Sequence, residues 1–375
     1  MKILIIGAGI GGLALAGFCE QFGIEYDIVE KQPDQSHHGF SLGMWINGRR
    51  MLTKLGLRDM FDAHAKPFRY FNIFNGKKEL VQQYNFDPFF QEYGMGYFHI
   101  HRKALIDGLQ SKLPAGKVEF SKTVTDIENV VRPNVTFANG EKKSYDLVVG
   151  ADGACSATRE KYFKHAVRTF VDWRVWYIWI DPKYADPHAV STHVEPGQYI
   201  IIFNEGDKAL AVLVARQDHT VWDKEENRMA TLNKVFAKEN TLVPNILLDK
   251  QAADILPSDL SEIHTSCMYD NRIALLGDAA HGFEPFAGLG GSMAMEDAYV
   301  LASELYKAKD LDVALRVYND KRMARVAKAL KITHRMQKIS ATTSSFGRKI
   351  MNFFLKYMSH KVFVKDYFKF LNEEI

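Results

Sequence analysis

The sequence predicts an α/β fold in which a parallel sheet with crossover helices carries an inserted, mainly antiparallel sheet and ends in C-terminal helices. Three observations support this prediction. The chain opens with a strand, a glycine turn, a helix and a second strand; β-branched and aromatic runs recur within residues 169–265; and the chain reads as helix from residue 312 almost to its end. Parallel strands require long crossover connections, whereas antiparallel strands need only tight turns.

The first unit is well delimited. Residues 2–6 form a short apolar strand, residues 7–12 a glycine turn, residues 13–22 an Ala- and Leu-rich helix closed by Gly23, and residues 26–30 a second strand. A helix that joins two parallel strands defines a βαβ unit. The unit predicts the start of a Rossmann-like domain.

Further strands and helices follow from the spacing of apolar residues and turn signals. Strands are expected at 70–74, 79–84, 118–120, 134–137, 144–151, 173–180, 198–204, 208–215 and 273–276, and helices at 48–57, 102–113 and 290–306. The runs at 173–180, 198–204 and 208–215 form a mainly antiparallel block that differs from the opening unit.

Composition and charge exclude several protein classes. The 375 residues are 47% apolar and 25% charged, which is typical of a globular protein. The net charge is +3, and residues 335–375 contribute eight Lys or Arg against three Asp or Glu, or +5. This pattern alone does not indicate nucleic-acid binding. We expect no signal peptide, no transmembrane span and no metal site, and we expect a cytoplasmic monomer or homodimer.

The first motif is Gly7-Ala8-Gly9-Ile10-Gly11-Gly12, with Glu30 at the end of the next strand. Glycines allow a tight turn and let backbone N–H groups approach a pyrophosphate, which the following helix N-terminus also favours. Glu30 can accept hydrogen bonds from a ribose diol. The motif predicts a dinucleotide site without deciding between FAD and NAD.

Two more motifs lie after buried strands. Residues 147–150 lead to Asp152-Gly153, at the edge of the sheet where ligands of α/β proteins bind. Residues 275–278 (Leu-Leu-Gly-Asp) lead to a loop, Pro285-Phe-Ala-Gly288-Leu289-Gly290, that opens a long helix. Asp278 is placed to bind a polyol and the helix N-terminus to stabilise an anion. His281 is a candidate general base, but a local structural role beside the loop is favoured.

In this order, the three motifs resemble those of the group A flavoprotein monooxygenases, the family of para-hydroxybenzoate hydroxylase, salicylate hydroxylase and the tetracycline-inactivating monooxygenases. The resemblance covers residues 1 to about 330 and includes Gly39–Gly43, Asn47, and Arg102 with Leu105. Three departures stand out. Lys31 replaces a frequent Arg, Ser292 replaces a frequent Asn, and apolar Leu42 and Met44 stand where some tetracycline-inactivating members have polar groups.

The resemblance implies site roles and a domain plan. It implies that FAD contacts Gly7, Gly9, Ile10, Gly11, Gly12, Glu30, Lys31, Arg102, Asp152, Asp278, Pro285, Gly288, Leu289 and Gly290. Pro285 and Gly288 would lie against the isoalloxazine ring, and Asp152 would also serve the pyridine nucleotide. The FAD-binding domain would comprise 1–69, 100–168 and 266–325, the substrate domain 70–99 and 169–265, and a C-terminal helical segment 326–375.

The implied reaction uses NADPH or NADH and O2 to hydroxylate an aromatic or polycyclic small molecule through a flavin C4a-hydroperoxide, so no catalytic side chain is assigned. The chain has no second dinucleotide fingerprint, and the nicotinamide cofactor would therefore bind transiently. Two alternatives remain: an FAD-dependent reductase or dehydrogenase acting on an isoprenoid-like substrate, and a non-catalytic flavin-binding protein. Substrate contacts are expected from residues 66–100 and 170–265.

The C-terminal tail combines basic residues with a helically spaced apolar stripe, formed by Phe346, Ile350, Phe353, Tyr357, Phe363, Tyr367 and Phe370. The favoured interpretation is a helix packed on the body of the protein with a partial lid role. A lid over the substrate entrance and a peripheral membrane contact are the alternatives.

Overall fold

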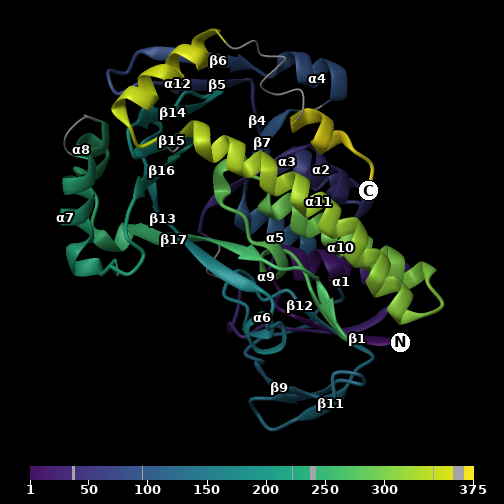
Figure 1. Ribbon diagram of the computed structural model, residues 1–375. Helices are drawn as coiled ribbons and strands as arrows, with labels where there is room; N and C mark the ends of the chain where they lie inside the picture. Colours follow the sequence, from purple (N-terminus) through teal and green to yellow (C-terminus); the bar gives the residue numbers. More distant parts are fainter. Residues whose placement is uncertain (36–38, 95, 222, 237–241, 341, 358–366) are drawn as a thin grey trace.

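The computed structural model describes the chain except residues 36–38, 95, 222, 237–241, 341 and 358–366. Two large sheets form its framework, and the long helix α11 (Leu311–Ser340) runs alongside both of them (Figure 1). The predicted α/β fold with an inserted antiparallel sheet and C-terminal helices is confirmed. No described helix is both long and apolar enough to cross a membrane.

The first sheet is the Rossmann-like one. Its strand order is β18-β19-β12-β1-β2-β8, in which every pair is parallel except β18 with β19. The parallel strands β1, β2, β12 and β19 therefore have their carboxyl ends at one edge. The bounds are β1 Lys2–Ile6, β2 Glu25–Val29, β8 Val118–Glu119, β12 Leu147–Gly150, β18 Tyr269–Asp270 and β19 Ile273–Leu275.

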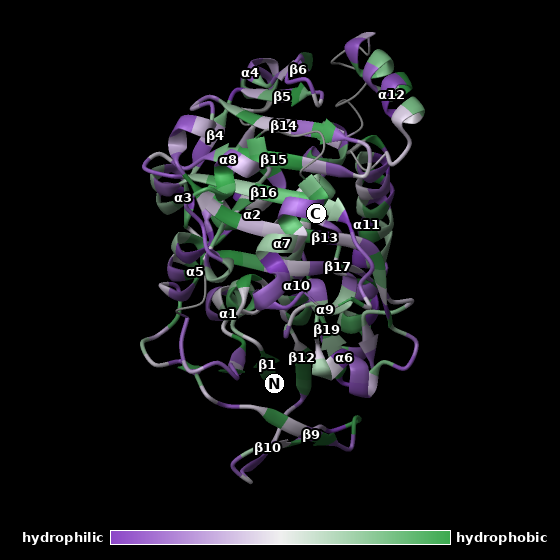
Figure 2. Ribbon diagram, turned by 90° about the vertical axis from the view of Figure 1, so that its left-hand side faces the viewer, coloured by the Kyte–Doolittle hydropathy of each residue, from purple (hydrophilic) through white to green (hydrophobic). Residues whose placement is uncertain are grey.

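The second sheet has seven strands in the order β17-β13-β16-β15-β14-β5-β6 and lies above the first in Figure 2. All its pairs are antiparallel except β14 with β5. The bounds are β5 Tyr70–Phe74, β6 Leu80–Asn85, β13 Val167–Ile180, β14 Ala189–Glu195, β15 Gln198–Asn204, β16 Ala209–Arg216 and β17 Ile255–His264.

The two faces of this sheet have different partners, because successive side chains of a strand point to opposite faces. On β13, Trp176 and Ile178 join a buried cluster with residues of α7 (Glu225–Phe236) and α8 (Leu242–Leu247). Tyr177, between them, points to the other face and lines a cavity. The sheet is therefore covered by helices on one side and open to a site on the other.

The remaining elements connect or cover these sheets. Two three-stranded sheets have the orders β3-β7-β4 and β11-β10-β9. The bounds are β3 Ser41–Met44, β4 Lys66–Phe68, β7 Tyr97–His101, β9 Val124–Glu128, β10 Asn134–Phe137, β11 Lys142–Ser144, α1 Ile10–Phe22, α2 Ile46–Lys54, α3 Arg58–His64, α4 Asp87–Tyr93, α5 Arg102–Gln110, α6 Ala157–Tyr162, α9 Asp278–His281, α10 Gly290–Lys307 and α12 Ser345–Tyr357. Short 3-10 helices span Pro182–Tyr184, Ala252–Asp254 and Pro285–Ala287.

A buried ion network joins α10 to α11. Glu296 and Asp297 on α10 are fully buried, and Arg322 on α11 binds both, with Nη1 2.9 Å from Glu296 Oε2 and Nε 2.5 Å from Asp297 Oδ1. Arg325 adds two further contacts to Glu296, each at 2.8 Å. Burial opposes ionisation of both acids, but the arginines, with His281 in the case of Asp297, hold the pKa of each carboxyl below its usual value.

The C-terminal tail divides into two parts. Tyr367 and Phe370 are buried, so the packing interpretation is confirmed for them. It is wrong for Phe346, Ile350, Phe353 and Tyr357 of α12, which are 42–73% exposed because Arg348 and Leu355 form the inward face of that helix. Phe363 lies outside the described residues.

The ion network predicts a large loss of stability when Arg322 becomes Leu. Breaking a buried ion pair leaves an uncompensated charge, which costs about 3–5 kcal/mol. We expect chemical denaturation to show a loss of this size in the free energy of unfolding. Arg316→Leu, at an exposed position of the same helix, is the matched control and should change it by less than about 0.5 kcal/mol. Equal small losses in both variants would contradict the role of the network.

Candidate functional site

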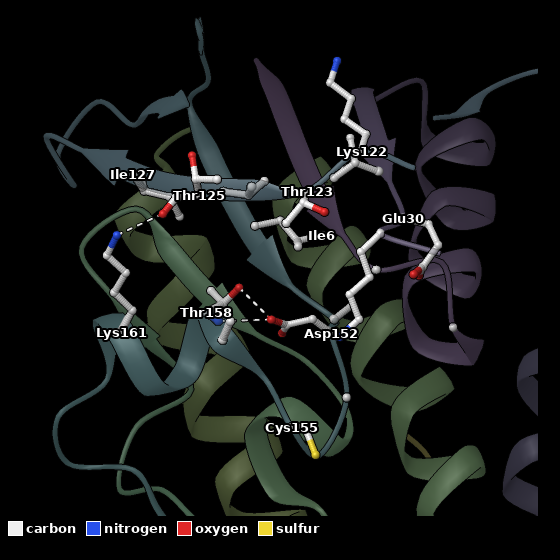
Figure 3. A pocket seen from close by; sticks show the side chains of 18 of the residues that line it. Ile6, Glu30, Lys122, Thr123, Thr125, Ile127, Asp152, Cys155, Thr158 and Lys161 are labelled. Atoms are coloured by element: carbon white, nitrogen blue, oxygen red, sulfur yellow. Dashed lines mark hydrogen bonds between the residues drawn. The ribbon is translucent and has the colours of Figure 1, made fainter. Parts of the chain in front are cut away.

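The first cavity, of about 280 Å³, opens at the carboxyl edge of the parallel sheet (Figure 3). Strands β1, β2 and β12 deliver Gly7, Glu30 and Asp152 to its wall. Lys31 and Arg102 also line it. The crossover topology thus gathers residues that are far apart in the chain, at the edge where α/β proteins bind ligands.

The glycines of the turn at residues 7–12 are required for different steric reasons. Gly7 has φ +105°, a conformation that residues with a Cβ rarely adopt. A Cβ on Gly12 would lie 2.0 Å from the Gly7 carbonyl oxygen. Gly9 differs, because a Cβ there would meet no protein atom within 4 Å. Gly12 is needed for the fold of the turn, whereas Gly9 keeps the cavity open to a closely approaching ligand.

Two carboxylates occupy this cavity in different ways (Figure 3). Glu30 is oriented by the backbone N–H groups of Ala8 and Gln32, each at 2.9 Å. Asp152 accepts hydrogen bonds from Ser156 Oγ at 2.5 Å and from both the backbone N–H and the hydroxyl of Thr158. Asp152 therefore also orders the turn into α6, the structural role that an Asp-Gly pair after a strand most often has.

A second cavity continues from the first toward the N-terminus of α10. Gly9, Arg102 and Gly153 line both cavities, and Asp278 and Gly288 line the second. The Arg102 side chain has no hydrogen-bond partner among the described residues. Asp278 lines this cavity with its side chain exposed to it. Desolvation raises the pKa of Asp278, and the positive charges of His281 and Arg102 oppose that rise. Ile10, Gly11, Pro285, Leu289 and Gly290 of the predicted set also line the second cavity, whereas Gly12 lines neither cavity.

Two titratable groups flank the 285–290 loop without touching the first cavity. His281 is 1% exposed, and its Nε2 lies 2.6 Å from Asp297 Oδ2, so the local structural role is supported over that of a general base. Glu284 is buried and accepts a hydrogen bond from Gln337 at 3.1 Å. Burial, reinforced by Glu262, raises the pKa of Glu284 to about 7.

The third cavity, of about 260 Å³, lies between the 285–290 loop and the open face of the seven-stranded sheet. It shares Leu42, Pro285 and Gly288 with the second cavity. Its lining is largely aromatic and aliphatic: Leu42, Trp45, Phe71, Phe86, Tyr97, Tyr177, Val190, Tyr199, Ile201, Phe203, Leu210, Val212, Val214 and Phe286, with polar Ser41, His99 and Thr192.

The predicted ranges 66–100 and 170–265 contain most of these lining residues, but Ser41, Leu42, Trp45 and the 285–288 segment lie outside them. Within the ranges, the sequence did not identify the individual lining residues. Strand alternation was the available signal. Tyr199, Ile201 and Phe203 on β15 line the cavity, whereas Ile200 and Ile202 face the helices. Because a one-residue change of register exchanges the two faces, the sequence alone did not show which set faces the site.

The first two cavities together fit an extended dinucleotide. The glycine cradle of residues 7–12 and the unpaired Arg102 guanidinium suit a pyrophosphate, and the Glu30 carboxylate suits a ribose diol. Cys155 also lines the first cavity, where it is an exposed thiol that forms no disulfide bond. Among the described residues, His, Cys, Asp and Glu gather with ligand-like spacing only at Asp172, Asp218 and His219, away from these cavities.

We predict that Gly9→Ala weakens FAD binding while leaving the apoprotein intact. Gly9 has φ −76°, which alanine adopts readily, and its Cβ would project into the ligand space alone. We expect the dissociation constant for FAD to rise at least about tenfold, or ~1.4 kcal/mol, with an unchanged melting temperature of the apoprotein. Gly12→Ala is the contrasting variant, which should lower that melting temperature. Unchanged FAD affinity in Gly9→Ala would place the ligand elsewhere.

Comparisons with known proteins agree with this geometry. The FAD binding domain family model matches residues 1–333. The FAD-dependent urate hydroxylase of Klebsiella pneumoniae subsp. pneumoniae is 30% identical over 340 residues, 87% of each chain. The 6-hydroxynicotinate 3-monooxygenase of Bordetella bronchiseptica is 24% identical and covers 89% of this chain and 90% of its own.

Solved structures show the same fold. Klebsiella pneumoniae HpxO, crystallised with FAD and uric acid, superposes with a TM-score of 0.90 at 24% identity, over 99% of this chain and 96% of its own. The tetracycline destructase Tet(55) gives a TM-score of 0.80 at 21% identity, over 99% and 97%. The chain belongs to the FAD binding domain family and is an FAD-dependent monooxygenase of the group A aromatic hydroxylase type.

Proposed function

We propose that this enzyme hydroxylates a small, planar, electron-rich ring bound in the third cavity, with NADPH or NADH as reductant and O2 as oxidant. The observation that carries the proposal is the junction of the two cavities at Leu42, Pro285 and Gly288. A ring in the aromatic-lined cavity would lie directly against a flavin in the neighbouring one. Uric acid and 6-hydroxynicotinate, named for two relatives, are small planar rings of this kind.

The residues of the first two cavities would hold FAD. Gly7, Gly9 and Gly12 would admit the pyrophosphate, and Glu30 and Lys31 would flank the adenosine ribose. Arg102 would neutralise phosphate charge, because its guanidinium lines both cavities and has no hydrogen-bond partner in the part of the chain that the structure describes. Asp278 would accept from the ribityl hydroxyls.

The 285–290 loop would place the ring system. Pro285 and Gly288 would contact it, and the N-terminus of α10 at Gly290 would stabilise negative charge on it. Bound FAD would supply electron transfer and oxygen activation. The chain's own part is to bind, orient and exclude water, which the apolar walls of the third cavity favour.

The loop is itself held from the substrate side. Trp45 Nε1 and the Tyr367 hydroxyl both donate to the carbonyl oxygen of Ala287, at 3.0 and 2.5 Å. Trp45 also packs edge-on against Tyr367 and Phe368. The end of the tail would therefore close one wall of the substrate cavity.

The cytoplasmic location, the oligomeric state and a membrane contact of the tail stay predictions, as do the domain boundaries.

We predict that the purified protein is yellow and releases FAD on acid precipitation, because no described contact suggests a covalent anchor. A small hydroxylated or N-heterocyclic aromatic that accelerates NADPH oxidation should consume O2 and form hydroxylated product in equal amounts. An oxygen electrode and product mass spectrometry measure both. Substrate-dependent NADPH oxidation under anaerobic conditions with a reduced product would instead identify a reductase, and the absence of any stimulation would indicate a non-catalytic flavoprotein.

A further inference from the structure

A buried histidine–carboxylate pair lies in the wall of the third cavity. His99, on β7, is 2% exposed, and its Nδ1 is hydrogen-bonded to Glu205 Oε1, from the turn after β15. The Glu205 side chain is 8% exposed. His99 lies on a strand of the three-stranded sheet and Glu205 in the turn between β15 and β16. They are separated by 106 positions, so only the folded chain brings them together.

The state of Glu205 determines the state of the imidazole. Burial opposes its ionisation, but the hydrogen bond from His99, aided by Ser41 and Lys66, holds the pKa of Glu205 below its usual value. An ionised carboxylate can only accept a hydrogen bond. The proton of a neutral His99 ring must therefore be on Nδ1, which leaves Nε2 with a free lone pair.

The imidazole ring of His99 lies in the wall of the cavity. His99 is stacked on Phe203, with ring centroids 4.1 Å apart and planes within 9°, so its orientation is restrained. Both rings line the cavity, and Nε2 has no hydrogen-bond partner among the described residues. Because His99 lines the cavity, a donor group of a ligand bound there can reach its imidazole.

We propose that His99 is a catalytic base that accepts a proton from an acidic O–H or N–H group of the substrate, with Glu205 as its positioning residue. In this step the substrate O–H or N–H bond breaks, the Nε2–H bond forms, and the electron pair stays on the substrate. No oxidant or reductant is involved. The inference rests on the proposed function. Hydroxylation benefits from the proton transfer because the ring anion is more electron-rich than the neutral ring and reacts more readily with the activated oxygen.

The pair also defines the substrate class. A phenol or a hydroxylated or N–H-acidic heteroaromatic can donate to Nε2, whereas a hydrocarbon ring or an aromatic ether cannot. Around His99, the other titratable groups are Tyr97 on its own strand, Tyr177 and Tyr199 from the sheet, and Lys66 beside Glu205. The pKa of Tyr97 is raised by burial and by Glu205, and those of Tyr177 and Tyr199 mainly by burial, so these three phenols remain neutral donors near pH 7.

The test uses 4-nitrophenol as the probe, because its anion absorbs visible light strongly and its neutral form does not. The holoenzyme is titrated with the probe from pH 5 to 8, and difference spectra report the ionised fraction of the bound probe. We expect the wild type to bind it largely as the anion well below the pH at which the free probe ionises. In His99→Gln the ionisation constant of the bound probe should fall about tenfold or more, and in Glu205→Gln by an intermediate factor.

His193→Gln is the matched control. His193 belongs to β14 of the seven-stranded sheet and is stacked on Phe74, outside the cavity, so the bound probe should ionise as in the wild type. With a turnover substrate, His99→Gln should lower kcat/KM on the order of 10²-fold at pH 7, with a loss that shrinks as pH rises and the substrate ionises unaided. If the His99→Gln variant does not fold, the ionisation of the probe bound to the Glu205→Gln variant still tests the inference.

Equal ionisation of the bound probe in wild type, His99→Gln and Glu205→Gln would overturn the inference, as would failure of the holoenzyme to bind the probe. Neither result would remove the proposed function. That function fails separately, if the wild type holds no FAD or shows no substrate-stimulated NADPH oxidation in any panel of aromatics.

Discussion

The structure depends on two acids that are buried side by side near the start of α10. Glu296 stays ionised inside the protein because Arg322 and Arg325 of α11 reach it, and Asp297 because His281 and Arg322 do. The same Asp297 carboxylate accepts from the Gly277 backbone N–H at 2.8 Å and from His281. Gly277 has φ +62° and immediately precedes Asp278, so this hydrogen bond holds the turn that presents Asp278 to the cavity. The Asp297 carboxylate lines none of the cavities, yet it positions Asp278, which would contact the cofactor.

The second constraint is that the two large sheets form different parts of the site. The parallel sheet gathers polar ligands at one edge, because its crossovers bring all carboxyl ends there. The seven-stranded sheet offers a broad face whose alternate side chains are free to be aromatic, since α7 and α8 cover the opposite face. The 285–290 loop lies where the two cavities meet, and the Ala287 carbonyl, bound by Trp45 and Tyr367, fixes that meeting point.

The fold and the cofactor side of the site were predictable from sequence, and the substrate side was not. Glycine turns after apolar strands carry their geometry locally, which is why Gly7, Glu30, Asp278 and Gly290 could be predicted as residues of one edge of the sheet, where they line the first two cavities. Strand β17 was missed because Pro257 and its charged residues mask the β pattern, and the pair His99–Glu205 has no local signal at all. The C-terminal tail shows the same limit. Its helical spacing indicated an apolar face but not which of these residues pack against the rest of the protein. Burial of Tyr367 and exposure of Phe353 depend on tertiary packing.

The most direct test of this account is the affinity of the Asp297→Asn variant for FAD. Asp297 lines none of the three cavities, and the substitution preserves its shape while removing the charge that binds His281 and Arg322. Fluorescence titration of the folded apoprotein should show a dissociation constant raised on the order of tenfold or more. An amide has only one acceptor oxygen, so it cannot keep the hydrogen bonds to Gly277 and His281 on one side and to Arg322 on the other. An unchanged FAD affinity, in a variant that retains its secondary structure, would contradict the claim that this buried charge positions the cofactor site.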